Sequence, residues 1–257
     1  MNQKIGLVLS GGGVRAIAHI GLVKVLLEHD IVPTHVSGTS AGALVSALYA
    51  NGYNTDEMIQ FFKQTPILDF SLYALKKPGL LDSEKYIRYF NKFFTENSFE
   101  KLKYPLTITA TNLLSGRLEY FSEGELIKPL IASCALPPLF SPLKINDNLY
   151  SDGGILNNFP VEPLKKQDVP KIVGSFVNPI TTVKASEINT SLKLIYRVYH
   201  LGLETNNIKK FKLCNYVFEP KPIDKIGTLE TKSIDAAFEI GYNQAKKEID
   251  GILKSLE

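Results

Sequence analysis

The sequence predicts an α/β fold of three layers, with helices on both faces of a mostly parallel central sheet. Two features of the chain predict it. Short apolar runs typical of buried strands alternate with longer segments in which apolar residues recur every three or four positions, as on one face of a helix. The first two strand-like runs are each followed by a turn of small residues and then a helical segment, which is how parallel strands are connected.

The opening elements set this pattern. Residues 5–9 are expected to form a buried strand, a glycine loop follows, and residues 15–29 carry the apolar periodicity of a helix. Residues 31–37 are expected to form the second strand, and residues 43–50 the helix after it. If the two strands are neighbours, the glycine loop and the turn after the second strand lie together at the carboxyl edge of the sheet, where active sites of such folds occur.

The rest of the chain continues the alternation. Further strands are expected at residues 105–111, 171–177 and 215–219, with a hairpin arm at 117–121 and a short strand that ends at Asp152. Helices are expected near residues 56–64, 83–94, 125–134, 192–205 and 233–256. Because no linker rich in proline, glycine or serine divides the chain, we expect one domain over residues 1–257.

Composition excludes several classes of protein. The net charge of +3 over 257 residues is too small to indicate nucleic-acid binding, which requires a clustered basic surface. The two cysteines, Cys134 and Cys214, are far apart in the chain and indicate neither a disulfide framework nor a metal site. The sequence also indicates no cofactor and no particular oligomeric state.

The chain contains no segment that predicts a membrane span. No apolar stretch approaches the roughly 18 residues of a spanning helix, and the N-terminus does not resemble a signal peptide. We therefore expect a cytoplasmic protein, and any contact with a membrane, such as the inner membrane surface, is expected to be peripheral.

Ser40 is the predicted nucleophile. It lies in the tract Gly-Thr-Ser-Ala-Gly, residues 38–42, between the second strand and the helix that follows it. Small residues around a serine allow the sharp strand-to-helix turn that exposes its Oγ, and the positive end of the next helix favours negative charge on that oxygen. The tract therefore has the context of a nucleophile elbow.

The chain has no histidine where a conventional catalytic triad would place its base. His19 and His29 lie in the first helix, His35 in the second strand and His200 in a late helix. Asp152 is the better candidate, because it ends a short strand at an Asp-Gly-Gly turn that can expose a carboxylate. Such a turn also forms for backbone reasons alone, and an aspartate base requires burial to raise its pKa from about 3.9.

A glycine loop, residues 11–15 (Gly-Gly-Gly-Val-Arg), follows the first strand. The backbone N–H groups of Gly12 and Gly13 are predicted to stabilise the oxyanion of a tetrahedral intermediate. A phosphate-binding loop is the alternative interpretation, but no Gly-Lys-Ser/Thr completes it, and Ala16 replaces the last glycine of a dinucleotide motif.

These three tracts, in this order, resemble the motifs of the patatin-like phospholipases. The resemblance implies that the glycine loop forms an oxyanion hole, the Gly-x-Ser-x-Gly tract holds the nucleophile, and Asp-Gly-Gly supplies the aspartate of a Ser-Asp dyad. It assigns the roles of nucleophile to Ser40, of base to Asp152, and of oxyanion site to Gly11, Gly12, Gly13 and Arg15. Residues 132–142 and 152–160 also resemble stretches of the family, so the resemblance covers about residues 5–180 and leaves residues 181–257 as the completion of the domain.

The resemblance implies a serine acyl hydrolase that cleaves fatty-acyl esters of phospholipids or lysophospholipids through an acyl-enzyme on Ser40, without a metal or other cofactor. Two alternatives stay open: a thioesterase or neutral-lipid esterase with the same dyad, and a regulatory lipid-binding protein with little turnover. The chain departs from the family at one position, where Ala16 replaces a glycine; this residue is expected to begin the helix and to need no glycine.

Residues 73–94 combine basic side chains with aromatic ones. Tyr86, Phe90, Phe93 and Phe94 fall on one helical face, with most of the basic residues off it. The pattern is typical both of a helix that docks on an anionic bilayer over the active site and of an ordinary amphipathic helix packed on the core. We favour the second interpretation.

Overall fold

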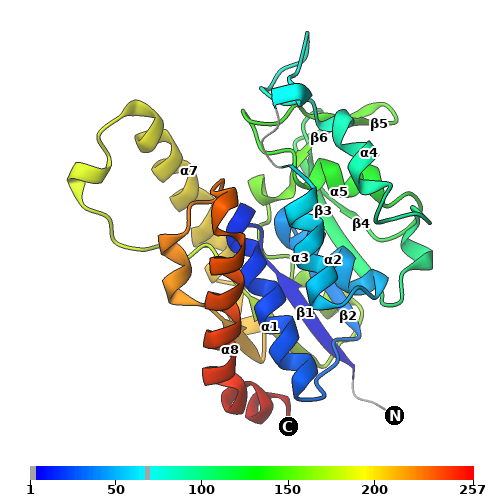
Figure 1. Ribbon diagram of the computed structural model, residues 1–257, viewed down its shortest axis with the longest axis vertical. Coiled ribbons are helices and arrows are strands. Elements are labelled where there is room, and N and C mark those ends of the chain that lie inside the picture. The colour runs from blue at the N-terminus through cyan, green and yellow to red at the C-terminus, as the bar shows by residue number, and fades with distance from the viewer. Residues whose placement is uncertain (1–3, 67–69) are drawn as a thin grey trace.

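The computed structural model describes residues 4–66 and 70–257, and over these residues the chain forms one eight-stranded sheet (Figure 1). The strand order is β5-β6-β3-β2-β1-β7-β8, and β4 pairs with β3. The strands are β1 (Ile5–Leu9), β2 (His35–Gly38), β3 (Leu106–Asn112), β4 (Arg117–Phe121), β5 (Leu143–Ile145), β6 (Asn148–Asp152), β7 (Lys171–Ser175) and β8 (Tyr216–Phe218). The run from β3 to β8 is parallel, whereas β4, β5 and β6 pair antiparallel. The prediction of a mostly parallel sheet is confirmed.

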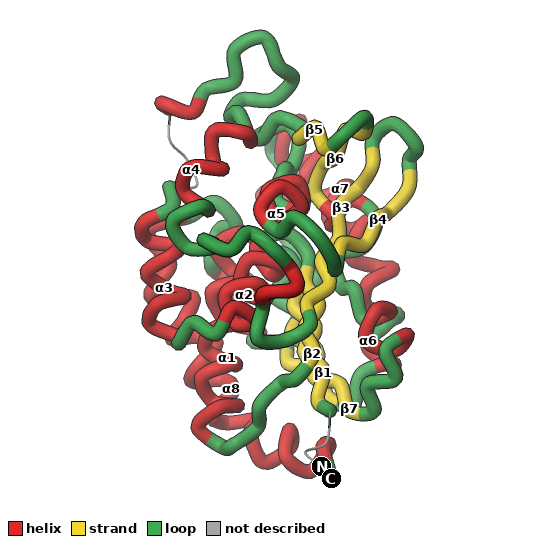
Figure 2. Tube along the Cα trace, turned by 90° about the vertical axis from the view of Figure 1, so that its right-hand side faces the viewer, coloured by secondary structure: helices red, strands yellow, loops and turns green. Residues whose placement is uncertain are grey.

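Helices cover both faces of this sheet, which confirms the predicted three-layer α/β arrangement. The helices are α1 (Ile17–Glu28), α2 (Ala41–Asn51), α3 (Thr55–Gln64), α4 (Ile87–Phe90), α5 (Ile127–Ser133), α6 (Glu162–Lys166), α7 (Ser191–Ile208) and α8 (Ile234–Leu256). Figure 2 shows α1, α2, α3 and α8 on one side of the strands and α6 on the other. No helix among the described residues combines the length and the apolar character needed to cross a membrane.

The core is divided by the sheet, as the alternation of side chains along β1 illustrates. Leu7 and Leu9 point into the larger cluster, which lies under α1, α2 and α8, while Val8 points into a smaller cluster with Phe159 and Leu164 on the α6 side. Since both faces of β1 are covered, the strand is apolar at nearly every position, as buried parallel strands are. This strand carries the glycine loop at its carboxyl end.

Two strands, β2 and β6, pair with the same edge of β3, and their carboxyl ends meet there. Ile108 pairs with both β2 and β4, and Ala110 pairs with both β4 and β6, so β2 and β6 lie on the same edge of β3, opposite β4. The chain direction of β2 is parallel to β3, and that of β6 is antiparallel, so their carboxyl ends converge near Thr109. Two turns far apart in sequence, after Gly38 and at Asp152, are thereby brought to one point.

Two predicted elements are corrected by the structure. The second strand begins at His35 rather than at residue 31, because the Ile31 N–H donates to the Leu26 carbonyl and so closes the end of α1. The helix predicted over residues 83–94 is broken into a 3-10 turn, the single-turn α4 and further turns. Strand β5 and the short α6 were not predicted.

The aromatic face of residues 73–94 belongs to the core. Tyr86, Phe90 and Phe94 are buried, and Phe61 of α3 stacks edge-on against Phe90 and Phe94. The favoured interpretation of an amphipathic segment packed on the core is therefore correct, and these rings are not exposed to a bilayer.

Candidate active site

Ser40 forms the turn between β2 and α2. Its backbone has φ 54° and ψ −132°, a conformation that L-residues avoid and that is found at strained functional turns. Its N–H donates to Ser133 Oγ at 2.8 Å, which holds the turn from the side of α5. The turn also needs Gly42, because a Cβ at that position would lie 2.3 Å from the carbonyl oxygen of Ser10. The sequence tract therefore folds as the predicted elbow.

Asp152 lies at the end of β6, where that strand meets β2 along β3. Its Oδ2 accepts a hydrogen bond from Ser40 Oγ at 2.7 Å, and its Oδ1 accepts one from the Gly154 N–H at 2.7 Å. Behind the pair, the hydroxyls of Thr39 and Thr109 hydrogen-bond at 2.7 Å and tie the elbow to β3. The carboxylate is thus oriented by its own turn and faces the serine.

Burial changes the acidity of Asp152. The side chain is buried, and this raises its pKa from an ordinary value of 3.8 to about 6, while the hydrogen bonds from Ser40 and Gly154 lower it in part. A carboxylate with this pKa is ionised at neutral pH and is better matched to accept a serine proton than an exposed aspartate. The requirement for burial that the sequence argument imposed on an aspartate base is met.

The glycine loop lies directly beside Ser40. A Cβ on Gly11 would be 2.9 Å from the Cβ of Ser40. The Gly11 N–H donates to Asn158 Oδ1 at 3.0 Å, and the loop turns at Gly13, whose φ is +57°. The backbone N–H of Val14, the next residue, donates to the Thr228 carbonyl at 2.9 Å. The loop is therefore fixed at both ends.

Arg15 and Ala16 complete this loop. The Arg15 Nε donates to the Ile226 carbonyl at 2.6 Å and its Nη2 to the Asp224 carbonyl at 3.2 Å, so the guanidinium fastens the loop to the segment after β8. Its assignment to the oxyanion site stays a prediction. Ala16 has φ −63° and ψ −15°, a helical conformation, so alanine fits here without strain, as expected.

His19 is buried behind the glycine loop rather than at the nucleophile. Its ring nitrogens hydrogen-bond to Ser175 Oγ at 2.7 Å and to the Ser10 carbonyl at 2.8 Å. Burial lowers its pKa to about 4, so the ring is neutral at physiological pH. It supports the strand ends, and the side chain that faces Ser40 Oγ is the carboxylate of Asp152.

The match to a family model identifies the family of this chain. The sequence model of the patatin-like phospholipases matches residues 7–165, more than half of the chain, and this span contains the glycine loop, the elbow and the Asp-Gly-Gly turn. The chain belongs to the patatin-like phospholipase family.

The relatives of this patatin-like protein are longer than the chain. An uncharacterized NTE family protein of Mycobacterium tuberculosis is 27% identical over 274 residues, which cover 95% of this chain and 46% of the relative. Lysophospholipase NTE1 of Scheffersomyces stipitis is 26% identical over 278 residues, which cover 96% of this chain and 18% of the relative. The chain thus spans less than half the length of these curated relatives. The crystal structure of VipD from Legionella pneumophila has a similar fold, with a TM-score of 0.52 at 16% identity over 97% of this chain and 67% of that one.

Several residues of the patatin-like site were not predicted from the sequence. Ser133 holds the Ser40 amide, and Cys134 lies beside the dyad, where burial and then the charge of Asp152 raise the pKa of its thiol. Asn158 holds the loop, and Glu204 of α7 holds Asn158. Asn158 follows the Asp-Gly-Gly tract within a stretch that resembles the family, which could have singled it out, whereas Glu204 lies outside the matched residues and carries no such signal.

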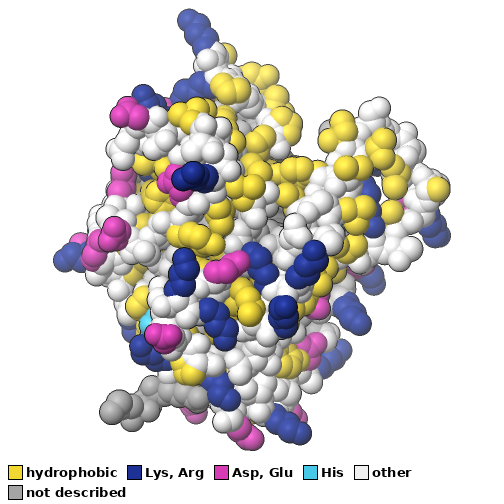
Figure 3. Space-filling model, turned by 180° about the vertical axis from the view of Figure 1, so that it is seen from behind, with side chains coloured by type: hydrophobic (Ala, Val, Ile, Leu, Met, Phe, Trp, Pro, Cys, Tyr) yellow, Lys and Arg dark blue, Asp and Glu magenta, His cyan; other side chains and the backbone are white. Residues whose placement is uncertain are grey.

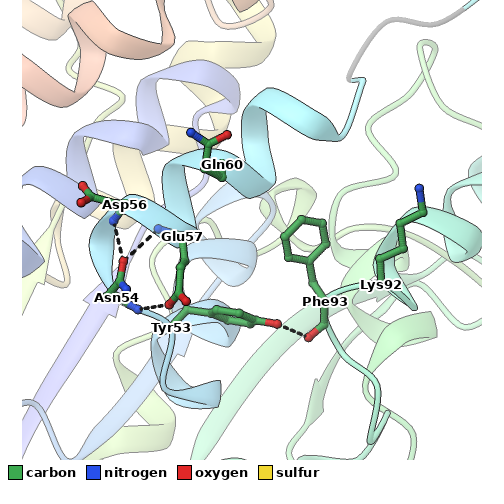
Figure 4. Close-up of a pocket in the computed structure, with 7 residues that line it drawn as sticks. All are labelled: Tyr53, Asn54, Asp56, Glu57, Gln60, Lys92 and Phe93. Atoms are coloured by element: carbon green, nitrogen blue, oxygen red, sulfur yellow. Dashed lines mark hydrogen bonds between the residues drawn. The ribbon is translucent and has the colours of Figure 1, made fainter.

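A surface cavity of about 420 Å³ lies away from the dyad (Figure 4). It lies at the end of α2 opposite to Ser40. Because α2 has 11 residues and rises 1.5 Å per residue, the cavity is about 16 Å from Ser40. Several of its polar groups are engaged in local structure: Asn54 Oδ1 accepts the N–H groups of Asp56 and Glu57, and the Tyr53 hydroxyl donates to the Phe93 carbonyl. This cavity lies between the start of α3 and the residues that follow α4, and it is not the candidate active site.

Proposed function

We propose that this protein is a lipid hydrolase that cleaves fatty-acyl esters of phospholipids or lysophospholipids, with Ser40 as nucleophile and Asp152 as base. The observation that carries the proposal is the 2.7 Å hydrogen bond from Ser40 Oγ to Asp152 Oδ2, made by a strained serine and a buried carboxylate. Membership of the patatin-like phospholipase family and similarity to proteins named lysophospholipases support the lipid class.

The proposed reaction proceeds through an acyl-enzyme. Ser40 Oγ attacks the ester carbonyl carbon while its proton passes to Asp152 Oδ2. The tetrahedral intermediate then collapses, and the alcohol part of the lipid leaves with the proton from Asp152. In the second half, a water molecule gives a proton to Asp152 and attacks the acyl-enzyme, after which the fatty acid leaves and the proton returns to Ser40 Oγ. No cofactor is needed in either half.

The glycine loop is the proposed source of oxyanion donors. The Gly11 N–H donates to Asn158, and the Arg15 guanidinium to carbonyls beyond β8, so we assign the donor role to the backbone N–H groups of Gly12 and Gly13. A well-placed donor of this kind stabilises a transition state by roughly 3–4 kcal/mol. The N-terminus of α2, which begins just after Ser40, adds a favourable dipole.

Helix α7 is the proposed contact with lipid. Leu194, Ile195 and Val198 on its outer side are 51%, 64% and 62% exposed. Figure 3 shows apolar side chains gathered along the hollow between the body of the molecule and the arm that carries the start of α7. Burial raises the pKa of Tyr199 to about 12, and the charge of Asp152 contributes, which supports the proximity of this helix to the dyad. An exposed apolar surface of this kind beside a site suits an acyl-chain substrate.

The first experiment measures hydrolysis of a short p-nitrophenyl ester by the wild type, Ser40→Ala and Asp152→Asn. We expect both variants to lose at least about 1,000-fold in kcat, because each removes one half of the reacting pair. Ser122→Ala and Asp147→Asn are matched controls, since both residues are exposed, and both should keep wild-type rates. Circular dichroism checks the fold of every variant. Activity that survives in folded Ser40→Ala or Asp152→Asn contradicts the proposed dyad.

A panel of substrates then tests the lipid class. We expect release of fatty acid from lysophosphatidylcholine micelles and phosphatidylcholine vesicles to exceed turnover of acyl-coenzyme A and triacylglycerol. A preference for the thioester or the neutral lipid would reassign the substrate while leaving the dyad in place. Tight lipid binding by a wild type that releases no fatty acid would instead favour a lipid-binding protein.

A further inference from the structure

Glu204 is a buried carboxylate on the inner side of α7, only 2% exposed. Its two oxygens accept three side-chain amide donors: Oε1 accepts Asn158 Nδ2 at 2.7 Å and Asn178 Nδ2 at 3.1 Å, and Oε2 accepts Asn207 Nδ2 at 3.1 Å. Burial of a charged group is unfavourable unless it is well hydrogen-bonded, so an arrangement of this kind calls for an explanation beyond stability.

The two asparagines that donate to Glu204 Oε1 also hydrogen-bond to one glycine, Gly11. Asn158 Oδ1 accepts the N–H of Gly11 at 3.0 Å, and Asn178 Nδ2 donates to the carbonyl of Gly11 at 2.9 Å. The two groups of one residue in the glycine loop are therefore held by two side chains from different parts of the chain. Both side chains are in turn held by one oxygen of Glu204.

The carboxylate decides which way each amide faces. An asparagine amide offers an oxygen on one side and an NH₂ group on the other, and either can point at a backbone group. Because Glu204 Oε1 can only accept when the carboxylate is ionised, the NH₂ groups of Asn158 and Asn178 turn toward it. The oxygen of Asn158 is then left facing the Gly11 N–H. A neutral or absent partner at residue 204 removes this selection.

The held glycine touches the nucleophile's own residue. A Cβ on Gly11 would lie 2.9 Å from Ser40 Cβ and 2.5 Å from Asn158 Oδ1, so a small shift of Gly11 moves the loop relative to Ser40. The two following residues supply the proposed oxyanion donors. A displacement of about 1 Å at such a donor is enough to lose much of its effect on the transition state.

We propose that Glu204 is a positioning residue, which acts through Asn158 and Asn178 to hold Gly11 and thereby sets the glycine loop against Ser40. This inference rests on the proposed function of the loop as the oxyanion site. It gives α7, which lies outside the part of the chain matched by the family, a role in the chemistry without contact with the reacting atoms.

The test compares Glu204→Gln and Glu204→Ala with the exposed neighbour Asn206→Ala on the same helix. Burial raises the pKa of Glu204 to about 7 and the charge of Asp152 contributes, so the carboxylate is ionised above pH 8, where the variants are compared, and replacing a buried charge by a neutral glutamine should not prevent folding. With the soluble ester we expect both Glu204 variants to lose about 10- to 100-fold in kcat with KM unchanged, because the loss is in the transition state. Asn206→Ala should match the wild type.

A double-mutant cycle identifies the route of the effect. If Glu204 acts through Asn158, the Glu204→Gln change should cost little in an Asn158→Ala background, since the connection is already cut. Independent, multiplicative losses in the double variant would overturn the proposal. Unchanged kcat in the folded Glu204 variants would overturn it as well.

A second measurement stays informative if the proposed function fails. Amide hydrogen exchange of Gly11 and the residues after it reports on the loop whether or not the protein hydrolyses esters. We expect at least about tenfold faster exchange of the Gly11 amide in Glu204→Gln, with the exchange of α2 unchanged. Unaltered exchange of this amide rejects the positioning role, whereas an inactive wild type with altered exchange rejects only the hydrolase.

Discussion

Two helices reach the candidate active site, and they differ in almost every physical respect. Helix α2 begins directly after Ser40 and is buried along nearly all of its length, with small and apolar side chains against the sheet. Helix α7 contributes the buried Glu204 from one side, while Leu194 and Ile195 on the other are exposed. The proposed nucleophile is therefore built into the core of the fold, whereas the proposed support of the glycine loop comes from a peripheral helix with an exposed apolar side.

Glycine substitutions separate the two helices most sharply. Gly42→Ala in α2 places a Cβ 2.3 Å from a backbone oxygen, so we expect a loss of about 3 kcal/mol or more in unfolding free energy, or no folded protein. Gly202→Ala in α7 meets nothing within 4 Å and should stabilise by up to about 1 kcal/mol. Urea unfolding measures both. Equal stability of the two variants would remove the contrast between a packed and an open helix.

Burial of the Asp152 carboxylate is expected to lower the free energy of unfolding. Because the folded pKa of Asp152 is about 6 and its ordinary value is 3.8, the folded protein holds the proton more tightly. The contribution of Asp152 to wild-type stability should therefore fall as pH rises from about 4 to 6 and then stay level. Asp152→Asn should be inactive yet more stable by about 2 kcal/mol at pH 8, with a smaller gain at pH 5. Urea unfolding at both pH values checks this, and a gain that does not depend on pH contradicts it.

The outer side of α7 should affect lipid turnover and nothing else. We expect Val198→Ser to reduce hydrolysis of phospholipid vesicles about tenfold, because the proposed lipid contact loses apolar area, while hydrolysis of a soluble ester and the melting temperature are unchanged. Val32→Ser is the matched control. Val32 is 40% exposed, but it precedes β2 and so lies at the amino ends of the parallel strands, away from Ser40 at their carboxyl ends. A wild-type rate of vesicle hydrolysis by Val198→Ser would argue that lipid approaches elsewhere.

The smallest expected effect is at Ala16, where the chain departs from its family. Because Ala16 already has a helical backbone conformation, Ala16→Gly should cost about 1 kcal/mol in unfolding free energy and leave kcat unchanged. Thermal unfolding and ester hydrolysis measure the two quantities. A large gain in activity would mean that alanine strains the loop.

The sequence allowed prediction of those features that depend on local sterics. Ser40 was found because an elbow requires small neighbours, and β1 because a strand buried on both faces is apolar at nearly every position. The start of β2 was misplaced, since the backbone hydrogen bond that ends α1 at Ile31 has no pattern in side chains. The favoured packing of Phe90 and Phe94 on the core is confirmed, although their apolar face alone does not separate core from lipid, because both surroundings select it.

Glu204 could not have been predicted, for a different reason. Its partner Asn158 lies 46 residues earlier in the chain, and only the packing of α7 brings the two together. In the sequence it is one acidic residue among the polar side chains that end a helix. A role that depends wholly on tertiary contacts produces no pattern in the neighbouring sequence.

The head-to-head meeting of β2 and β6 on β3 has a consequence for biosynthesis. Ser40 leaves the ribosome 112 residues before Asp152, and until β6 has taken its place on β3 the serine faces no carboxylate. A nascent chain therefore carries an elbow that lacks its proposed base. The order of translation delays the proposed chemistry until most of the sheet is complete.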